Sequence, residues 1–370
     1  CPDRHECPSS MFRHAPDIVP VRLSSGIDVA SFLDTVGSTC FEARQLLRGA
    51  RLWQAAVEEG STIWLGIAGA GIAGGLGGIA IQLIEAGLVD VICTTGAQAY
   101  HDLHFAFGLP VKAVDPHGDD DELARHGDTR IYDIGIRERE TLEAQDEIIR
   151  EFVADTWEEW EERGSADSAT FMMRLGLWVA ARAPHPERSF VVAAAEAGVP
   201  VFWDSLTNHS IAMTLAGCAS EGMDVSLSAH QDILRSAALA YRGGEIGFVE
   251  LGGGGPKNFI QQTGPTISQI LGIKNFHGAS RGLQISTANP REGSLSSCTF
   301  GEAVTWGKYE SADAGRLVQV WGEYSILFPL LAAYVLGRCS PREHKRLFAR
   351  IDGFLAELES DIPSRADRWL

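Results

Sequence analysis

The chain has 370 residues, of which 45% are hydrophobic and 22% are charged. This is the composition of an ordinary globular protein, and it excludes a disordered or fibrous chain. The 49 acidic and 31 basic residues give a formal net charge of −18, which disfavours a nucleic-acid partner because binding to a phosphate backbone needs basic patches. An acidic surface attracts cationic small molecules instead.

The seven cysteines are scattered and include no CxxC pair, so the sequence predicts neither a zinc site nor a disulfide framework. Residues 1–20 lack the continuous apolar core of a signal peptide. We therefore expect a cytoplasmic protein with a flexible tail over residues 1–20 and a single domain over residues 21–370.

The first part of that domain alternates helix-like and strand-like patterns. Apolar residues recur at helical spacing from Ile27 to Glu59. Thr62–Gly66 is typical of a buried strand, Leu76–Ala86 of a helix and Val89–Thr95 of a second buried strand. Ser61–Ile84 is uncharged and long enough to cross a bilayer, but its seven glycines favour a strand, a loop and a helix over a membrane span.

Further along the chain, Glu138–Arg163 has the apolar spacing of one long amphipathic helix. Ser189–Ala195 fits either a helix start or a short strand, and residues 323–362 fit two helices separated by Pro341. Four more apolar runs are expected to be strands: Val199–Trp203, Ile246–Leu251, Gly282–Ser286 and Leu317–Trp321. Buried strands alternating with helices predict an α/β fold, with a doubly wound, mostly parallel, Rossmann-like sheet and helices on both faces. Such sheets bind ligands at the carboxyl ends of their strands.

Two glycine-rich segments follow expected strands. Gly69, Gly71 and Gly74 have the spacing of a dinucleotide fingerprint, but no acidic residue ends the next strand, and tight packing of a helix on a strand explains the same glycines. Gly252–Gly255 favours a ligand that touches the backbone over a plain loop, because four consecutive glycines are costly in chain entropy. Thr94–Ala97 fits a ligand contact or the N-cap of the next helix equally well.

Glu302–Lys308 places a lysine close to a tryptophan and a carboxylate. A lysine in an apolar pocket loses its charge more easily and becomes nucleophilic. From spacing alone, a surface strand with a solvated lysine is the better interpretation. His117–Glu122 is better explained by carboxylates at a helix start than by a metal site, and we expect no bound metal.

Several of these segments together resemble deoxyhypusine synthases over about residues 27–336. Glu302–Lys308 reads EAVTWGK and Ser325–Leu331 reads SILFPLL; the family carries its reactive lysine in EAVSWGK, before SLVFPLL. Val89–Ala97 is similar to the family's DVLVTTAG strand, and Leu251–Gly254 to its LGGG loop. Ser286–Ala288 resembles the NTA segment that contacts NAD in the family.

The resemblance implies a Rossmann-like homotetramer with active sites between paired subunits. It also implies a reaction in which NAD takes hydride from the carbon beside an amine, Lys308 captures the aminobutyl unit as an imine, and an acceptor amine removes it. The NAD-binding residues implied are Thr95, Gly96, Ala97, Gly252, Gly253, Gly254, Thr287, Ala288 and Glu323.

The sequence also departs from the protein-modifying members of that family. Their TDGSLGD is Thr207–Met213 here, without either acid, and their EEDL is Tyr100–Leu103, reading YHDL. A histidine of the family is replaced by Asn258, and an acid by Leu295. Glu302 is the one carboxylate left of those expected around the polyamine. The YHD and PKNF features look like the bacterial, homospermidine synthase-like branch.

These comparisons predict a substrate site formed by Glu302, Trp306, Asn258, His101 and Asn208, with Lys308 as the catalytic residue. The leading hypothesis is NAD-dependent aminobutyl transfer between small amines, with putrescine or spermidine as donor. The alternatives are NAD-dependent chemistry on another amine of specialised metabolism, deoxyhypusine synthesis on a protein lysine, and non-enzymatic binding of NAD or polyamine. The intact Lys308 argues against the last of these.

Overall fold

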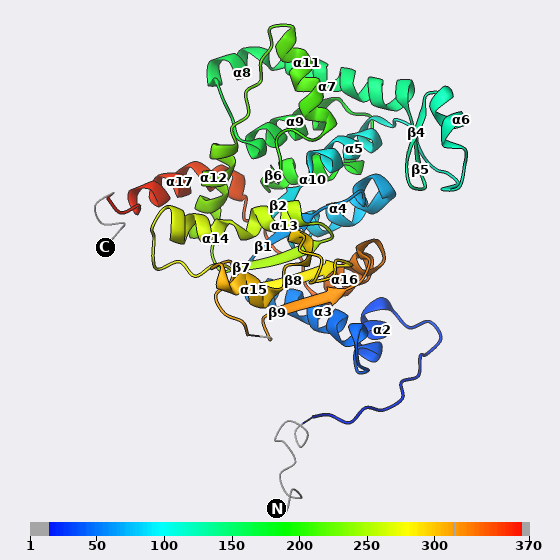
Figure 1. Cartoon of the computed structure of the whole chain (residues 1–370), viewed down its shortest axis with the longest axis vertical. Helices are drawn as coiled ribbons and strands as arrows, with labels where there is room; N and C mark the ends of the chain where they lie inside the picture. Colours follow the sequence, from blue (N-terminus) through cyan, green and yellow to red (C-terminus); the bar gives the residue numbers. More distant parts are fainter. Residues whose placement is uncertain (1–14, 314, 365–370) are drawn as a thin grey trace, which may run out of the picture.

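The computed structural model describes residues 15–313 and 315–364. Within them, a six-stranded sheet forms the centre of the molecule (Figure 1), and every neighbouring pair of its strands is parallel. The strands are β1 Thr62–Ile67, β2 Val91–Thr94, β6 Val201–Trp203, β7 Ile246–Leu251, β8 Arg281–Ser286 and β9 Leu317–Trp321, in the spatial order β6-β2-β1-β7-β8-β9.

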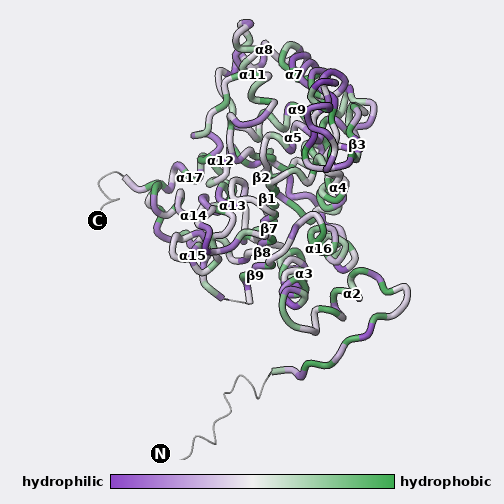
Figure 2. The backbone as a smooth tube through the Cα atoms, turned by 45° about the vertical axis from the view of Figure 1, so that its right-hand side comes forward, coloured by the Kyte–Doolittle hydropathy of each residue, from purple (hydrophilic) through white to green (hydrophobic). Residues whose placement is uncertain are grey.

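Both faces of this sheet are covered. In β1 the side chains of Ile63 and Leu65 enter one hydrophobic cluster, whereas Trp64 enters a second cluster on the opposite face, as the two-residue period of a strand requires. Figure 2 shows hydrophobic segments gathered along the sheet and hydrophilic ones on outlying helices. The predicted doubly wound parallel sheet with helices on both faces is therefore confirmed.

The two clusters are completed by different helices. The first includes side chains of α2 Val29–Val36, α3 Glu42–Glu58, α4 Gly77–Glu85, α5 Gly96–Phe107, α7 Ala144–Asp155, α9 Ser168–Arg182, α10 Phe190–Ala197, α11 Ser210–Ser220 and α16 Tyr324–Arg338. The second includes side chains of α12 Ala229–Arg242, α13 Gly254–Gln261, α15 Phe300–Thr305 and α17 Ile351–Ser360. No helix of the described residues is long and apolar enough to span a bilayer.

The strand order reverses between β1 and β7. From β1 the chain continues outward through β2 and β6, and it then returns to form β7 on the other side of β1. The loops that leave β1 and β7 therefore diverge and leave a crevice at their carboxyl ends. Both loops are the glycine-rich segments identified in the sequence, so the fold itself places them at the expected ligand-binding edge.

A small antiparallel sheet was not expected from the sequence. It consists of β3 Val111–Ala113, β5 Ile134–Arg137 and β4 Asp128–Ile131, in that spatial order. Its strands have three or four residues, and most of their side chains are at least partly exposed, so they lack a strong hydrophobic pattern. The helix between β3 and β4, α6 Asp120–Arg125, is capped by Asp119, as the helix-start interpretation of that acidic segment predicted.

The segment 138–163 is not the single helix that the sequence predicted. It divides into a π-helical turn η2 Glu138–Glu143, helix α7 and helix α8 Trp157–Arg163. Thr156 leaves helical geometry at φ −115° and ψ 9°. Its hydroxyl donates to the Phe152 carbonyl and accepts from the Trp160 indole. These local bonds compete with the helix ladder and stabilise the break.

Other boundaries are close to those predicted. Phe190–Ala197 is a helix, α10, with Ser189 as its N-cap, which settles the choice between helix and strand there. Residues 15–24 contain no helix or strand and are exposed; residues 1–14, the rest of the predicted tail, lie outside the described residues.

Candidate active site

Three cavities open along the edge of the sheet where the parallel strands end. We name each after one of its lining residues. The Tyr132 cavity, approximately 670 Å³, lies between the loop after β1 and the small sheet. The Thr287 cavity, approximately 280 Å³, lies at the ends of β7, β8 and β9. The Asn258 cavity, approximately 560 Å³, lies beside α13.

The Thr287 cavity collects most of the predicted cofactor-binding residues. Gly252, Gly253, Thr287, Ala288 and Glu323 all line it. They come from the ends of three neighbouring strands, and Glu323 is the N-cap of α16. The structure therefore brings together residues from three segments that are far apart in the sequence.

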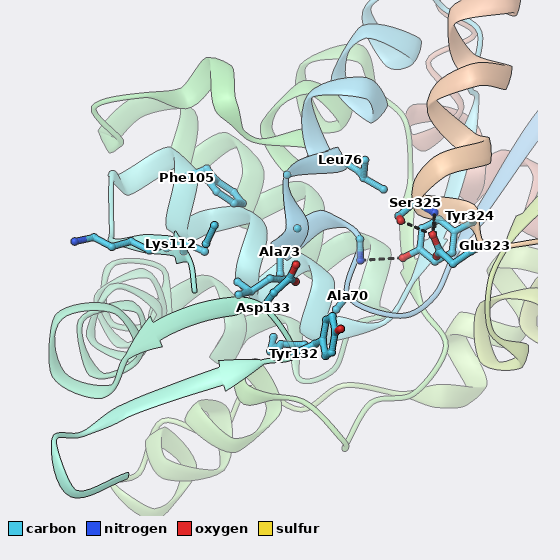
Figure 3. Close-up of a pocket in the computed structure, with 17 residues that line it drawn as sticks. Ala70, Ala73, Leu76, Phe105, Lys112, Tyr132, Asp133, Glu323, Tyr324 and Ser325 are labelled. Atoms are coloured by element: carbon cyan, nitrogen blue, oxygen red, sulfur yellow. Dashed lines mark hydrogen bonds between the residues drawn. The ribbon is translucent and has the colours of Figure 1, made fainter. Parts of the chain in front are cut away.

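Tyr324 links this cavity to the Tyr132 cavity, because it lines both. Its hydroxyl accepts from the Gly71 N–H at 2.8 Å (Figure 3). The same hydroxyl donates to the Ala68 carbonyl at 2.8 Å. A Cβ at Gly71 would lie 2.4 Å from that hydroxyl, and one at Gly252 would lie 3.0 Å from the ring. The glycines at 71 and 252 are thus needed to hold Tyr324 between the two loops.

The start of α13 separates the Thr287 cavity from the Asn258 cavity. Gly253 lines the first cavity and Gly255 lines the second. Gly254, which was predicted to bind cofactor, lies in the first turn of α13 and packs under Leu295, whose Cβ would be 2.4 Å from a Cβ at residue 254. The four-glycine run is therefore partly helix, and Gly254 packs closely against Leu295; its contact with a cofactor stays a prediction.

Thr95, Gly96 and Ala97, also predicted to bind cofactor, line none of the three cavities. Thr95 is the N-cap of α5 and accepts from the Gln98 N–H. Gly96 lies against the ring of His209, which a Cβ would approach to 2.3 Å. The helix cap, one of the two interpretations of this segment, is therefore present, and the contact with a cofactor stays a prediction.

Lys308 is buried, with 7% of its surface exposed. It follows the short helix α15, so Glu302–Lys308 is not the surface strand that spacing alone favoured. Its backbone is packed between two loops: a Cβ at Gly264 would lie 2.4 Å from the Gly307 carbonyl oxygen, and one at Gly278 would lie 2.5 Å from that of Lys308. The Lys308 Nζ donates to the Asn258 Oδ1 at 2.9 Å. Asn258 in turn lines the Asn258 cavity.

Burial lowers the pKa of the Lys308 ammonium, because leaving water disfavours the charged form. The nearby Lys257 also lowers this pKa, whereas Cys298, Glu250 and Glu302 raise it. The lowered pKa increases the fraction of Lys308 that is neutral at a given pH, and the neutral amine is the nucleophilic form.

Behind Lys308 lies a buried polar network that the sequence did not reveal. One oxygen of Glu250 accepts from the Gln261 amide at 2.6 Å and from the Tyr309 hydroxyl at 2.9 Å. The Lys257 Nζ donates to the Gln284 amide oxygen at 3.0 Å and to the Cys298 carbonyl at 2.6 Å. Glu250 and Lys257 are the two charged groups of this network. A charged residue inside an otherwise apolar strand was the available signal for Glu250.

The predicted substrate residues are not all in one place. Asn258 and Trp306 both line the Asn258 cavity. Glu302 is exposed on α15, and Asn208 is exposed in the loop before α11. His101 is half-buried on α5, where its Nδ1 is 3.1 Å from the His104 Nε2. Within this single chain, Glu302, Asn208 and His101 line none of the three cavities.

One carboxylate of the Asn258 cavity was not predicted from the sequence. Asp204, the residue after β6, lines the cavity together with Asn258 and Trp306. Its Oδ1 is buried and has no hydrogen-bond partner among the described residues. Burial raises the pKa of Asp204 to about 6. Glu302 is therefore not the one carboxylate available to a cationic ligand here.

Comparison with known proteins identifies the family of the chain. Residues 31–335 match the profile of the family described as deoxyhypusine synthase. The chain is 35% identical over 366 residues to a deoxyhypusine synthase-like protein of Cyanothece sp., an alignment that covers 95% of this chain and 89% of the relative. It is 32% identical over 324 residues to a "probable deoxyhypusine synthase 2" of Methanosarcina mazei, covering 87% of this chain and 90% of the relative.

A solved structure has the same fold. The "putative deoxyhypusine synthase" of Entamoeba histolytica aligns with a TM-score of 0.57 at 16% sequence identity, covering 86% of this chain and 96% of that chain. At this level of identity the likeness concerns the fold alone.

Proposed function

The chain belongs to the deoxyhypusine synthase family, and on that premise we propose that it transfers an aminobutyl group between small amines through an imine on Lys308. Members of this family are NAD-dependent aminobutyl transferases that act on amines. The choice of small amines, with putrescine or spermidine as donor and a homospermidine-type product, is the proposal.

The observation that carries the proposal is the placement of Lys308. Its amine is removed from water, its pKa is lowered, and it is hydrogen-bonded to a side chain that lines a cavity of approximately 560 Å³. A neutral amine held at a fixed position is what imine formation requires. A lysine with only a structural role would be expected to pair with a carboxylate or to reach solvent.

The Thr287 cavity fits a dinucleotide by its chemistry. Gly252 and Gly253 present bare backbone at the end of β7, where a pyrophosphate can approach closely. The Glu323 carboxylate accepts from the backbone and side chain of Ser325 and keeps further lone pairs for ribose hydroxyls. We propose that Gly252, Gly253, Thr287, Ala288 and Glu323 bind NAD. Thr95, Gly96 and Ala97, which follow β2 at the same edge of the sheet, and Gly254 complete the set of residues that we propose for NAD.

When bound, NAD would accept a hydride from the carbon beside the amine and later return it. The residues of the chain do the rest. Lys308 adds to that carbon, and the donor's own nitrogen leaves as ammonia from putrescine or as diaminopropane from spermidine. The acceptor amine then displaces Lys308 from the same carbon. Asn258 positions the Lys308 Nζ between these steps, and Trp306 offers an aromatic face to an ammonium.

Small amines are favoured over a protein lysine by the replaced residues. Asn208, Asn258 and Leu295 stand where the protein-modifying members carry acids or a histidine. Leu295 lines the Asn258 cavity and puts an apolar side chain there. A lost carboxylate removes a charged hydrogen bond worth about 1.5–3 kcal/mol, which argues for a different set of cationic substrates.

The rim of the Asn258 cavity supports a site closed by a second copy. Four large apolar side chains that line it are exposed in the single chain: Ile233 43%, Ile270 63%, Leu295 55% and Trp306 62%. Exposed apolar side chains gathered in one place mark interaction surfaces. We propose that paired subunits of a homotetramer cover this rim, and that His101, Asn208 and Glu302 contribute to the closed site.

The proposal is tested by incubating the protein with NAD and a panel of amines and identifying products by mass spectrometry. The panel contains putrescine, spermidine, cadaverine and a protein carrying the lysine that deoxyhypusine synthases modify. We expect a coupled small amine from putrescine or spermidine. Modification of the protein lysine alone would instead support deoxyhypusine synthesis. Products only from other amines would move the specialised-metabolite hypothesis to first place.

A further inference from the structure

We infer that Asp204 binds the non-reacting ammonium of an aliphatic diamine in the Asn258 cavity. This inference rests on the proposed function and names the class of its substrate. It would assign a role to a residue that lies outside every motif of the family resemblance.

The position of Asp204 is fixed by the sheet. It directly follows β6, and its backbone N–H donates to the Thr94 carbonyl at the end of β2 at 3.1 Å. Its Oδ2 lies against Gly255, where a Cβ would come within 1.9 Å of that oxygen. The glycine at 255 therefore lets the end of β6 approach the first turn of α13 (Figure 1), and it keeps the carboxylate at the wall of the cavity.

No cationic side chain among the described residues pairs with this carboxylate. Burial raises the pKa of Asp204, and the hydrogen bonds that lower it come from the backbone of Asp204 and Ser205. A carboxylate at a cavity wall without a cationic partner is a site for a positively charged ligand. An ammonium group in the cavity would supply a charge-assisted hydrogen bond together with the opposite charge.

The rest of the cavity suits an alkyl chain. Beside Asp204 and Asn258, the lining includes the apolar side chains of Ile233, Phe259, Ile270 and Leu295. Methylene groups can contact these side chains without the loss of a hydrogen bond. A second ammonium in the middle of the chain would face apolar groups instead, because Asp204 is the one carboxylate among the residues that line this cavity.

Asp204 and Asn258 line the same cavity and then have separate roles. Asp204 holds the ammonium that does not react, and Asn258, which binds the Lys308 Nζ, marks the position of the reacting amine. A ligand with two terminal amines provides a partner for both groups. A monoamine of equal length leaves one of them without a partner, so the site should discriminate between these two ligands.

The experiment measures binding, separately from turnover. The protein saturated with NADH, which cannot oxidise an amine, is titrated by calorimetry with 1,4-diaminobutane and with n-butylamine. We expect the wild type to bind the diamine at least about tenfold more tightly than the monoamine, as one charged hydrogen bond predicts. Asp204→Asn and Asp204→Ala should both reduce this ratio to about one, while NADH binding shows that each variant is folded.

Asp224→Asn is the matched control. It removes the same charge from an exposed residue that lies outside the cavity lining, and it should keep the wild-type ratio. An unchanged ratio in the Asp204 variants, or a wild type that does not prefer the diamine, would overturn the role of Asp204 but not aminobutyl transfer. Wild-type protein that prefers the diamine and yields no coupled amine with NAD would overturn the proposed function. The binding of an ammonium by Asp204 would still be supported.

Discussion

The Thr287 and Asn258 cavities lie at the same edge of one sheet but are surrounded by different kinds of chemical group. The wall of the Thr287 cavity includes glycine backbone, and Tyr324 packs where side chains at positions 71 and 252 would otherwise lie. The Asn258 cavity instead lies beside charged side chains: Asp204 lines it, and the buried Lys308, whose pKa Lys257 and Glu250 influence, is hydrogen-bonded to Asn258. We conclude that the first region works through shape and the second through charge.

This difference should appear most strongly in the substitution Lys308→Arg. A guanidinium cannot form the imine, so transfer should fall below detection by mass spectrometry of the products. NAD binding, which depends on the other region, should stay within about twofold of wild type by calorimetry. Borohydride should trap an aminobutyl adduct on Lys308 in the wild type only.

Lys274→Arg provides the control for this experiment, because Lys274 is exposed and should retain wild-type transfer. A Lys308→Arg protein that forms product at a rate near wild type would disprove the covalent mechanism. The noncovalent NAD-dependent reaction on another amine would then become the leading explanation.

Gly71→Ala should weaken NAD binding and leave the reactivity of Lys308 unchanged, which is the opposite of the result expected for Lys308→Arg. The added Cβ would lie 2.4 Å from the Tyr324 hydroxyl, so the ring must move and its hydrogen bonds to Gly71 and Ala68 must break. Losing about one net hydrogen bond should weaken NAD binding by about tenfold in calorimetry. Adduct formation between Lys308 and an added aliphatic aldehyde, trapped by borohydride without NAD, should not change.

Gly78→Ala is the matched control, because a Cβ at Gly78 meets nothing within 4 Å and alanine is the better helix former. It should leave NAD binding unchanged. If Gly71→Ala binds NAD as tightly as wild type does, the contact between Tyr324 and Gly71 does not shape the cofactor site. The proposed dependence of NAD binding on the glycines of this region would then be wrong.

The smallest expected effect concerns the charges behind Lys308. The neighbouring Lys257 lowers the Lys308 pKa, and Cys298, Glu250 and Glu302 raise it. Lys257→Met removes the lowering charge, so the Lys308 pKa should rise and less neutral amine should be present at a given pH. Aldehyde trapping on Lys308 should become about three- to tenfold slower at pH 7.5. It should recover as the pH is raised.

Lys274→Met removes a lysine charge that does not act on Lys308, and its pH profile should match that of wild type. A Lys257→Met profile that is superimposable on wild type would show that burial alone sets the reactivity of Lys308. A profile that is lower at every pH, without a shift, would point to loss of structure instead, which the melting temperature would reveal.

Much of the fold could be predicted because its signals are local. The six strands of the central sheet are short apolar runs, and each of them was predicted within a few residues. The small antiparallel sheet was missed because strands such as Val111–Ala113 have too few buried residues to form a pattern. The break at Thr156 was missed because the apolar spacing continues across it, while the side-chain hydrogen bonds that stabilise the break depend on the folded geometry.

The candidate site divides in the same way. The motif around Lys308 and the glycine runs after β1 and β7 were visible as residue types at fixed spacing. The sequence itself therefore determined the family, the parallel sheet and the lysine for which we propose the chemistry. These features depend on residues that are neighbours along the chain or along one strand.

Tertiary structure decided which groups meet at the candidate site. Tyr324 meets Gly71 across 253 positions of sequence, Asn258 meets Lys308 across 50, and Asp204 reaches the cavity because Gly255 leaves room for it. No local pattern records such meetings, since they arise only when the strands align and their carboxyl ends come together at one edge. The burial that lowers the Lys308 pKa is likewise a property of the packed protein, because desolvation depends on all the atoms that exclude water from the amine.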